Sequence, residues 1–103
     1  MKIIKKLSER IEEELEDAEL YARMAVEWKD KDQALAKVFY DISGQELGHV
    51  NLLHGEVVKL IEKHRKEHGE PPASMMALYD YMHERHVAKA NMVKVYHGQY
   101  RGE

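Results

Sequence analysis

Two short breaks divide this chain into three long segments, each with the apolar periodicity of an α-helix. The first break, residues 29–32, contains no apolar residue, and the second, residues 69–72, places a glycine and two prolines where a helix would stop. Within the segments, apolar residues recur at steps of three and four, the spacing of one helix face. The sequence therefore predicts an all-α fold in a single domain spanning residues 1–103, without strands.

The apolar stripe is regular in the first two predicted helices and irregular in the third. The first begins near Ile3 or Ser8 and ends at Trp28, the second spans Gln33–Glu67 with Asp32 as its N-cap, and the third spans Ala73–Tyr100. The first inward stripe comprises Ile4, Leu7, Ile11, Glu14, Ala18, Tyr21, Ala25 and Trp28. The second comprises Leu35, Phe39, Ile42, Glu46, His49, Leu53 and Leu60, widened by Val38, Val50, Val57 and Ile61. The third is less regular, with Met75, Leu78, Met82, Val93 and Tyr96 apolar and Tyr79, His83, His86, Ala90 and His97 on an adjacent face.

Composition excludes several classes of function. The chain has no cysteine, which removes disulfides, thiolate catalysis and iron–sulfur clusters and is compatible with a reducing cytoplasm. Its net charge of −3 gives no bulk basic charge for nucleic acid. No apolar run approaches the roughly 18 residues that span a bilayer. The basic start, Met1–Lys6, is not followed by the apolar core of a signal peptide. We therefore expect a cytoplasmic protein that binds neither nucleic acid nor membrane.

Two charged or ionisable residues interrupt the inward stripe of the second helix. Glu46 and His49 lie three residues apart, so they share a helix face. A charge on a buried face is costly unless it is paired or bound to metal. Glu14 interrupts the first helix in the same way, and both glutamates lie 16 residues from residue 30, the middle of the first break. With a rise of about 1.5 Å per residue, antiparallel helices would bring Glu14 and Glu46 to one level, with His49 one turn further along the second helix, so the three residues converge.

Counting residues from the second break gives the height of residues in the third helix in the same way. Tyr96 and His97 are expected level with the three residues, whereas His83 and His86 lie nearer the level of Val57. The latter two, with Glu84, could form a separate cluster with His54 or be solvated. Surface or packing roles are favoured over metal ligation for His83, His86 and His97. Gly44 and Gly48, inside the second helix, indicate either close approach of another backbone or a ligand, or simply tolerated flexibility.

One chain holds only half of a known type of metal site. A carboxylate di-metal site in a four-helix bundle uses two glutamates and two Glu-x-x-His steps. This chain offers one of each, in Glu14 and Glu46–His49. A symmetric dimer, the commonest oligomer, would supply the other half. We therefore expect a homodimer or a higher homo-oligomer, with the third helix outside the core or extending the interface.

These residues resemble the ferritin-like superfamily over roughly residues 7–60. The segment from Glu14 to Tyr21 is similar to the first-helix motif of rubrerythrins, bacterioferritins and encapsulated ferritins, in which a ligand glutamate precedes a tyrosine by seven positions. Glu46-Leu47-Gly48-His49 is similar to their second-helix motif. The resemblance implies an antiparallel helical hairpin plus a third helix, with the four-helix bundle completed by dimerisation, as in half-length members. Residues 97–103 lack the glycine- and leucine-rich cargo tail of encapsulated members.

The resemblance also implies a ligand set and a reaction. Glu14 would be a terminal ligand, Glu46 a bridging ligand, His49 the nitrogen ligand, and Tyr21 a neighbouring hydrogen-bond donor. Such donors suit iron, two ions per dimer, with manganese or zinc also possible. The expected function is a ferroxidase-type oxidoreductase that oxidises Fe(II) with dioxygen or peroxide, in iron handling or defence against oxidative stress.

Two further interpretations concern the acidic residues around the metal site and an alternative class of function. The first helix is rich in acidic residues that could guide cations, and Glu13 and Glu16 flank the ligand most closely. A solvated charged face is the simpler interpretation for most of them. The alternative to the enzyme is a non-catalytic helical dimerisation or interaction module, in which the metal site is structural or lost.

Overall fold

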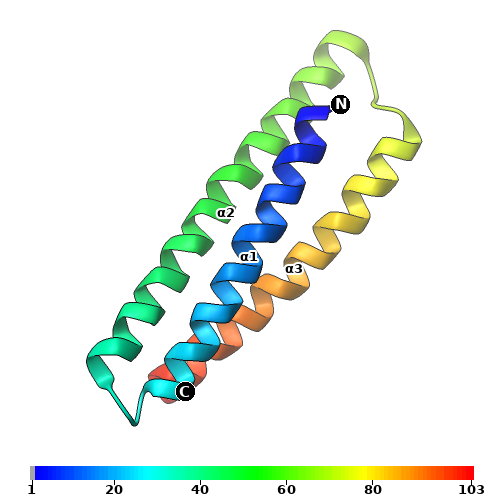
Figure 1. Ribbon diagram of the computed structural model, residues 1–103. Coiled ribbons are helices and arrows are strands. Elements are labelled where there is room, and N and C mark those ends of the chain that lie inside the picture. The colour runs from blue at the N-terminus through cyan, green and yellow to red at the C-terminus, as the bar shows by residue number, and fades with distance from the viewer. Residues whose placement is uncertain (1) are drawn as a thin grey trace.

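The computed structural model describes residues 2–103, which form three helices (Figure 1). They are α1 (Lys2–Trp28), α2 (Gln33–His68) and α3 (Ala73–Arg101). No strand occurs within these residues. The all-α prediction is therefore confirmed, and each predicted boundary lies within one residue of the observed one when the first helix is begun at Ile3.

Local hydrogen bonds explain where α2 begins and ends. The Asp32 carboxylate accepts a hydrogen bond from the Leu35 backbone N–H at 3.1 Å, which confirms the predicted N-cap. At the other end, Gly69 has a φ of 79°, and its N–H donates to the carbonyl oxygen of Arg65 at 3.0 Å. Glycine adopts this left-handed conformation without the strain that a side chain would add. The prolines that follow prevent α2 from continuing.

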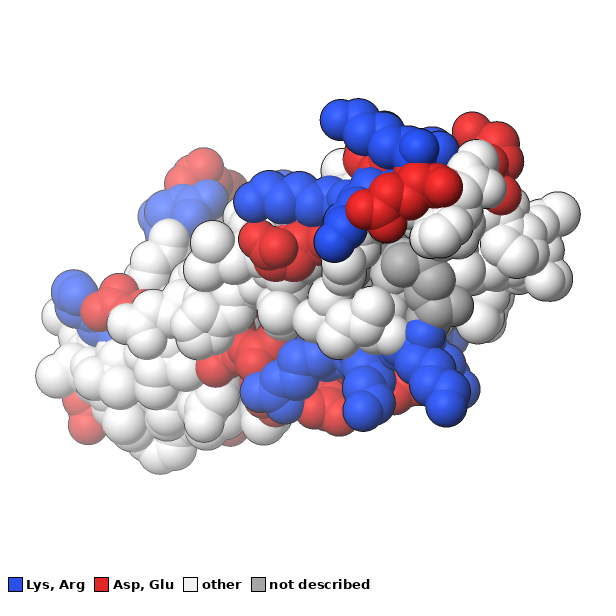
Figure 2. Space-filling model, turned by 90° about the horizontal axis from the view of Figure 1, so that it is seen from above, with Lys and Arg blue, Asp and Glu red and all other residues white. Residues whose placement is uncertain are grey.

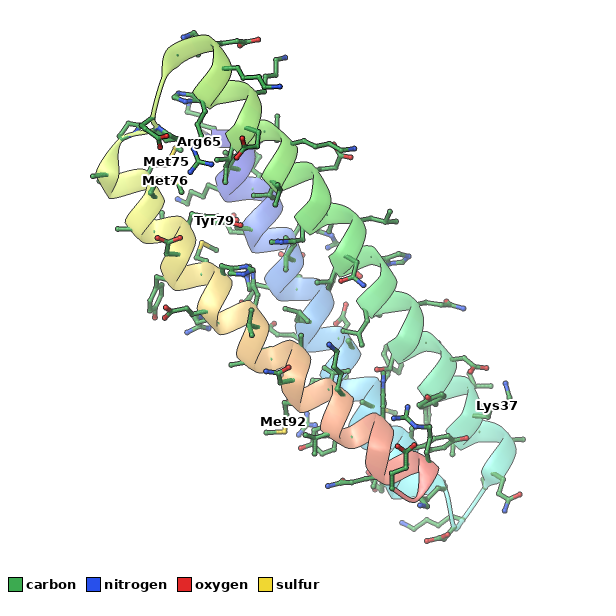
Figure 3. All side chains as sticks on the ribbon, turned by 180° about the vertical axis from the view of Figure 1, so that it is seen from behind. Lys37, Arg65, Met75, Met76, Tyr79 and Met92 are labelled. Carbon is green, nitrogen blue, oxygen red and sulfur yellow. The ribbon has the colours of Figure 1, made fainter. Side chains whose placement is uncertain are left out.

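The molecule is a rod of 55 × 19 × 18 Å, in which α1 lies between the other two helices (Figures 1 and 3). The N-terminus and the α2–α3 connection lie at one end of the rod, and the C-terminus and the α1–α2 connection lie at the other (Figure 1). Helix α3 begins well apart from α2 and reaches α1 along its length (Figure 1). Both outer helices therefore depend on α1 for most of their packing.

The buried core changes in character along α1. Toward its N-terminus, Ile4, Ile11 and Leu15 pack with residues of α2 that include Val50 and Val57. Toward its C-terminus the core side chains are small, and Ala18, Ala22 and Ala25 are completely buried. Alanine allows neighbouring helices to approach closely, and Val93 of α3 packs against the first two of these residues. The predicted inward face of the first helix is thus largely confirmed.

The predicted inward face of α2 is confirmed in part: its widening residues Val50, Val57 and Ile61 are buried, whereas Val38 is exposed and the central stripe is offset by about one residue. The buried line of this helix consists of Ala36, Ser43, Val50, Val57 and Ile61. The predicted residues Leu35, Phe39, Ile42, Glu46, Leu53 and Leu60 are half-buried, and His49 is exposed. The physical reason is that the apolar surface of α2 is wider than one helix contact. Helices α1 and α3 cover one edge of it, and the other edge has no described element over it.

Helix α3 departs further from its predicted apolar face. Its buried residues are His86, Val93 and His97, whereas Leu78 is exposed. The packing roles favoured for His86 and His97 agree with this burial. Acidic and basic side chains are intermixed rather than segregated by sign on the face shown in Figure 2. Within residues 2–103, none of the helices has a stretch both apolar and long enough to cross a membrane.

Gly44 and Gly48, inside α2, have open space around them. A Cβ atom built on Gly44 or Gly48 would meet no heavy atom within 4 Å among the described residues. No other backbone therefore approaches these glycines closely within residues 2–103, and approach by a ligand or a second subunit stays a prediction.

Candidate metal centre

The antiparallel pairing of α1 and α2 brings the three predicted ligands together. Glu14 lies midway along α1, and Glu46 and His49 lie midway along α2. Each offers a ligand atom, and these atoms all lie within 4.8 Å of one another. It is the one group of three or more possible metal-ligating side chains that meets this condition in residues 2–103. The level predicted by counting residues from the first break is confirmed.

Two carboxylates converge on one imidazole nitrogen. Nδ1 of His49 lies 3.3 Å from Oε2 of Glu14 and 3.9 Å from Oε2 of Glu46. The Glu14 and Glu46 side chains also hydrogen-bond to each other. Exposure rises across the group, since the side chains of Glu14, Glu46 and His49 are 7%, 19% and 57% exposed. The site is therefore closed on the Glu14 side and open on the His49 side.

The proximity of the two carboxylates perturbs both of them. The hydrogen bond with Glu14, burial and the Glu14 charge together raise the pKa of Glu46 to about 7. The same hydrogen bond lowers the pKa of Glu14 below its ordinary value, helped by His49 and Arg10 and opposed by burial. Two carboxyl groups at this separation cannot both ionise easily without a nearby cation. The donor set therefore fits a divalent cation with preference for oxygen and imidazole, such as iron or manganese.

Arg10 is a neighbour of the site that the sequence analysis did not identify. Its Nη2 donates to Oε1 of Glu14 at 2.6 Å, and its Nη1 donates to Oε2 of Glu13 at 2.6 Å. Arg10 precedes Glu14 by four residues, and this spacing favours ion pairs on a helix. The ion pair between Arg10 and Glu14 could therefore have been predicted from the sequence. Arg10 leaves the other Glu14 oxygen directed to His49, and it orients the carboxylate.

Other predicted neighbours of the ligands are not gathered at the site. Glu13 is exposed and paired with Arg10, and Glu16 is exposed and lies 3.5 Å from Lys89 of α3. Tyr21 is half-buried with its ring centroid 6.1 Å from that of Phe39, and no hydrogen bond joins its hydroxyl to Glu14 or Glu46 in residues 2–103. Its role as a hydrogen-bond donor to the site stays a prediction.

His97 reaches the predicted level but faces a different partner. Its Nε2 lies 2.7 Å from Oγ of Ser43, and this hydroxyl donates to the carbonyl oxygen of Ala18 at 2.7 Å. A hydroxyl has one proton to give, so Nε2 of His97 must be the donor in this pair. His97 cannot then act as a base toward Ser43, which is completely buried. The pair ties the three helices together and does not form a nucleophile.

A second group of histidines lies on the side of the hairpin toward α3. The rings of His54 and His83 stack with centroids 5.0 Å apart, which agrees with the alternative of a separate cluster rather than that of solvated side chains. Nε2 of His86 lies 3.2 Å from Oε2 of Glu12 without hydrogen-bond geometry. Arg85 and Lys89 also pair with Glu12, at 2.8 and 3.3 Å. These two cations already neutralise the carboxylate, so the group is poorly suited to a metal ion.

Compared with protein-family models, curated proteins and solved structures, the chain has no significant match. The function is therefore argued from the geometry and chemistry of the site.

Proposed function

We propose that this protein is a ferritin-like di-iron protein that binds two metal ions between two subunits and oxidises Fe(II) with dioxygen or peroxide. The observation that carries the proposal is the convergence of Glu14, Glu46 and His49 within 4.8 Å. A glutamate from one helix and a Glu-x-x-His step from the next are half of a carboxylate-bridged site. The class agrees with the resemblance carried by the two sequence motifs.

The open side of the site supports pairing of two subunits. Helix α3 contacts α1 through Glu12, which lies two residues before Glu14 and so points to another side of the helix. Glu14, Glu46 and His49 therefore lie on a face of the α1–α2 hairpin that α3 leaves uncovered. We call it the hairpin face. Its half-buried apolar members are Leu7, Tyr21 and Trp28 of α1 and Leu35, Phe39, Ile42, Leu53 and Leu60 of α2.

A two-fold axis through the hairpin face would give a four-helix core around both half-sites. The apolar residues would be removed from water, which supplies the free energy of association. His49, the most exposed of the three ligands, would be covered by the second subunit. In this arrangement Glu14 and Glu46 would hold the two ions through their carboxylate oxygens, and His49 would supply the nitrogen ligand.

The protein residues prepare the site electrostatically. Glu14 is held by Arg10 and is the more acidic of the two carboxyl groups, so it presents a negative charge to an arriving cation. Glu46 retains a proton near neutral pH and would release it when a cation takes the place of that proton. Two adjacent Fe(II) ions bound there would supply two electrons to dioxygen or peroxide. The ligands would then serve to hold both ions in one geometry.

Anaerobic titration with Fe(II), read together with the mass of the protein in solution, tests the proposal. We expect uptake of two ions per dimer, and loss of uptake in the Glu46→Ala variant. Glu56→Ala is the matched control, because Glu56 is an exposed glutamate on the same helix that pairs with Lys59. A purified protein that is helical and dimeric but takes up no Fe(II) would contradict the proposal.

The second candidate function is a helical dimerisation module without catalytic metal. The observation in its favour is Arg10, which compensates the charge of Glu14 without any cation from solution. This candidate predicts that Glu46→Ala leaves the solution mass and the helical content unchanged, and that neither the parent protein nor the variant consumes oxygen with Fe(II). Oxygen consumption by the parent protein alone would favour the di-iron function.

A further inference from the structure

A cleft of about 590 Å³ lies at the end of the rod where α1 and α3 begin and α2 ends. It forms because α3 diverges from α2 at this end (Figure 1). Tyr79 extends from α3 toward α1, with Met75 one turn earlier (Figure 3). The volume falls within the range of about 300–1,000 Å³ found for small-molecule sites. The cleft is separate from the metal centre, which lies midway along the rod on the hairpin face.

The walls of the cleft are mainly apolar. Ile4 of α1 lines it together with Met75, Leu78, Tyr79 and Met82 of α3. Ile4, Met75 and Tyr79 also belong to the packing of the main core, so the cleft opens directly onto that core. Leu78 is 47% exposed, which leaves apolar surface in contact with water. An apolar ligand would gain free energy by covering this surface.

The charged residues that line the cleft, Lys2 and Lys5, are both cationic. Lys2 and Lys5 line it from the first turn of α1, and no acidic residue is among its lining residues. Lys5 has only a long contact with Glu9, at 3.9 Å between exposed groups. His64 also lines the cleft, and its Nδ1 is buried with no hydrogen-bond partner among the described residues. These groups can donate to an anion, and none of them would repel one.

We propose that this cleft binds a single-chain anionic amphiphile of the fatty-acid type. The hydrocarbon chain lies along Leu78, Met82 and the neighbouring apolar wall, and the carboxylate lies beside Lys2 and Lys5. The combination of an apolar wall with a cationic rim selects both parts of such a molecule. A neutral chain would lack the electrostatic attraction, and a cationic one would be repelled.

Decanoate, used below its micellar concentration, is the probe for calorimetric titration of the protein. We expect saturable binding of one molecule per chain, tightening about fourfold for each further methylene that is buried. Decyltrimethylammonium, with the same chain and the opposite charge, is expected to bind at least tenfold more weakly. Equal affinity for the two amphiphiles, or no saturable binding of decanoate, would overturn the proposal.

Matched variants separate the cleft from the general charge of the protein. Lys5→Glu is expected to weaken decanoate binding about five- to tenfold. Lys6→Glu reverses the neighbouring charge on the same helix outside the cleft and is expected to leave binding unchanged. Leu78→Asp places a charge on the apolar wall and is expected to abolish binding while circular dichroism shows an intact helical fold. Equal losses in the two lysine variants would contradict the assignment of the carboxylate.

The main rival occupant of the cleft is a second copy of this chain. If Leu78→Asp converts a dimer into a monomer in solution, the cleft is an interface and the proposal is wrong. Glu46→Ala is expected to leave decanoate affinity unchanged, because the metal centre lies elsewhere on the molecule. Failure of the amphiphile site would therefore leave the di-iron function untouched, and the reverse also holds.

Discussion

Replacing Glu46 by glutamine is expected to stabilise the metal-free protein above neutral pH. The folded protein raises the pKa of Glu46 from 4.5 to about 7, first through the hydrogen bond with Glu14 and then through burial. Such a rise costs about 3 kcal/mol of folding free energy once the pH lies above both values. Glutamine carries no charge, and its amide can still donate to Glu14. The substitution removes the cost and keeps the hydrogen bond.

The sign of the effect fixes its pH dependence. Below pH 4.5 both the folded and the unfolded chain hold the Glu46 proton, so the parent protein has no penalty there. Between pH 4.5 and about 7 the unfolded chain releases the proton while the folded chain keeps it, and the penalty grows. Above about 7 it is constant. The stability advantage of Glu46→Gln should therefore rise across this interval and reach about 3 kcal/mol at pH 8.

Urea unfolding at fixed protein concentration, in the presence of a chelator and between pH 4.5 and 8, measures this advantage. Comparison with the parent protein at each pH cancels the titration of other groups. Glu56→Gln, an exposed change on the same helix, should show no pH-dependent difference. A difference between Glu46→Gln and the parent protein that stays flat across the interval, or that is negative at pH 8, would show that the Glu46 charge is not destabilising in the folded protein.

Three further predictions concern the helices around the site. Gly44→Ala and Gly48→Ala should each raise the free energy of unfolding by about 0.5–1 kcal/mol, since the added methyl groups meet nothing within 4 Å. Urea unfolding measures this change. A lower free energy of unfolding in either variant would reveal a close contact in the assembled protein. Ser43→Ala should cost about 1–3 kcal/mol in the same assay, because it leaves the buried Nε2–H of His97 without its acceptor, whereas Ser74→Ala at an exposed position should cost little. Burial lowers the pKa of His97. The contribution of neutral His97 to the free energy of unfolding is therefore complete above pH 6.5 and is lost as the pH falls through the lowered pKa. If the free energy of unfolding falls equally with pH in the parent protein and in His97→Gln, this prediction is wrong.

The helices and the level of the site could be predicted because both depend on local rules. Asp32 and Gly69 mark helix ends by their own hydrogen bonds and backbone conformations. Counting residues from a short connection gives the height of Glu14 and Glu46, since the rise per residue of a helix is constant. These features require no knowledge of which side chains touch across helices.

The features that were missed depend on how the helices are rotated about their axes. The wide apolar surface of α2 allowed several inward faces, and packing against α1 buried the line that includes Ser43 rather than the line that includes Ile42. The hydrogen bond between Ser43 and His97 spans 54 residues of sequence, so no local pattern predicts it. The divergence of α3 that opens the terminal cleft is likewise a property of the packed molecule.

The most direct test of the central claim is anomalous scattering from crystals of the protein loaded with Fe(II), measured at the iron absorption edge. We expect two peaks on or beside a two-fold axis, each within bonding distance of Glu14, Glu46 and His49 side chains contributed by both subunits. Iron peaks elsewhere, or a dimer whose hairpin faces point away from each other with no peak at these residues, would contradict it.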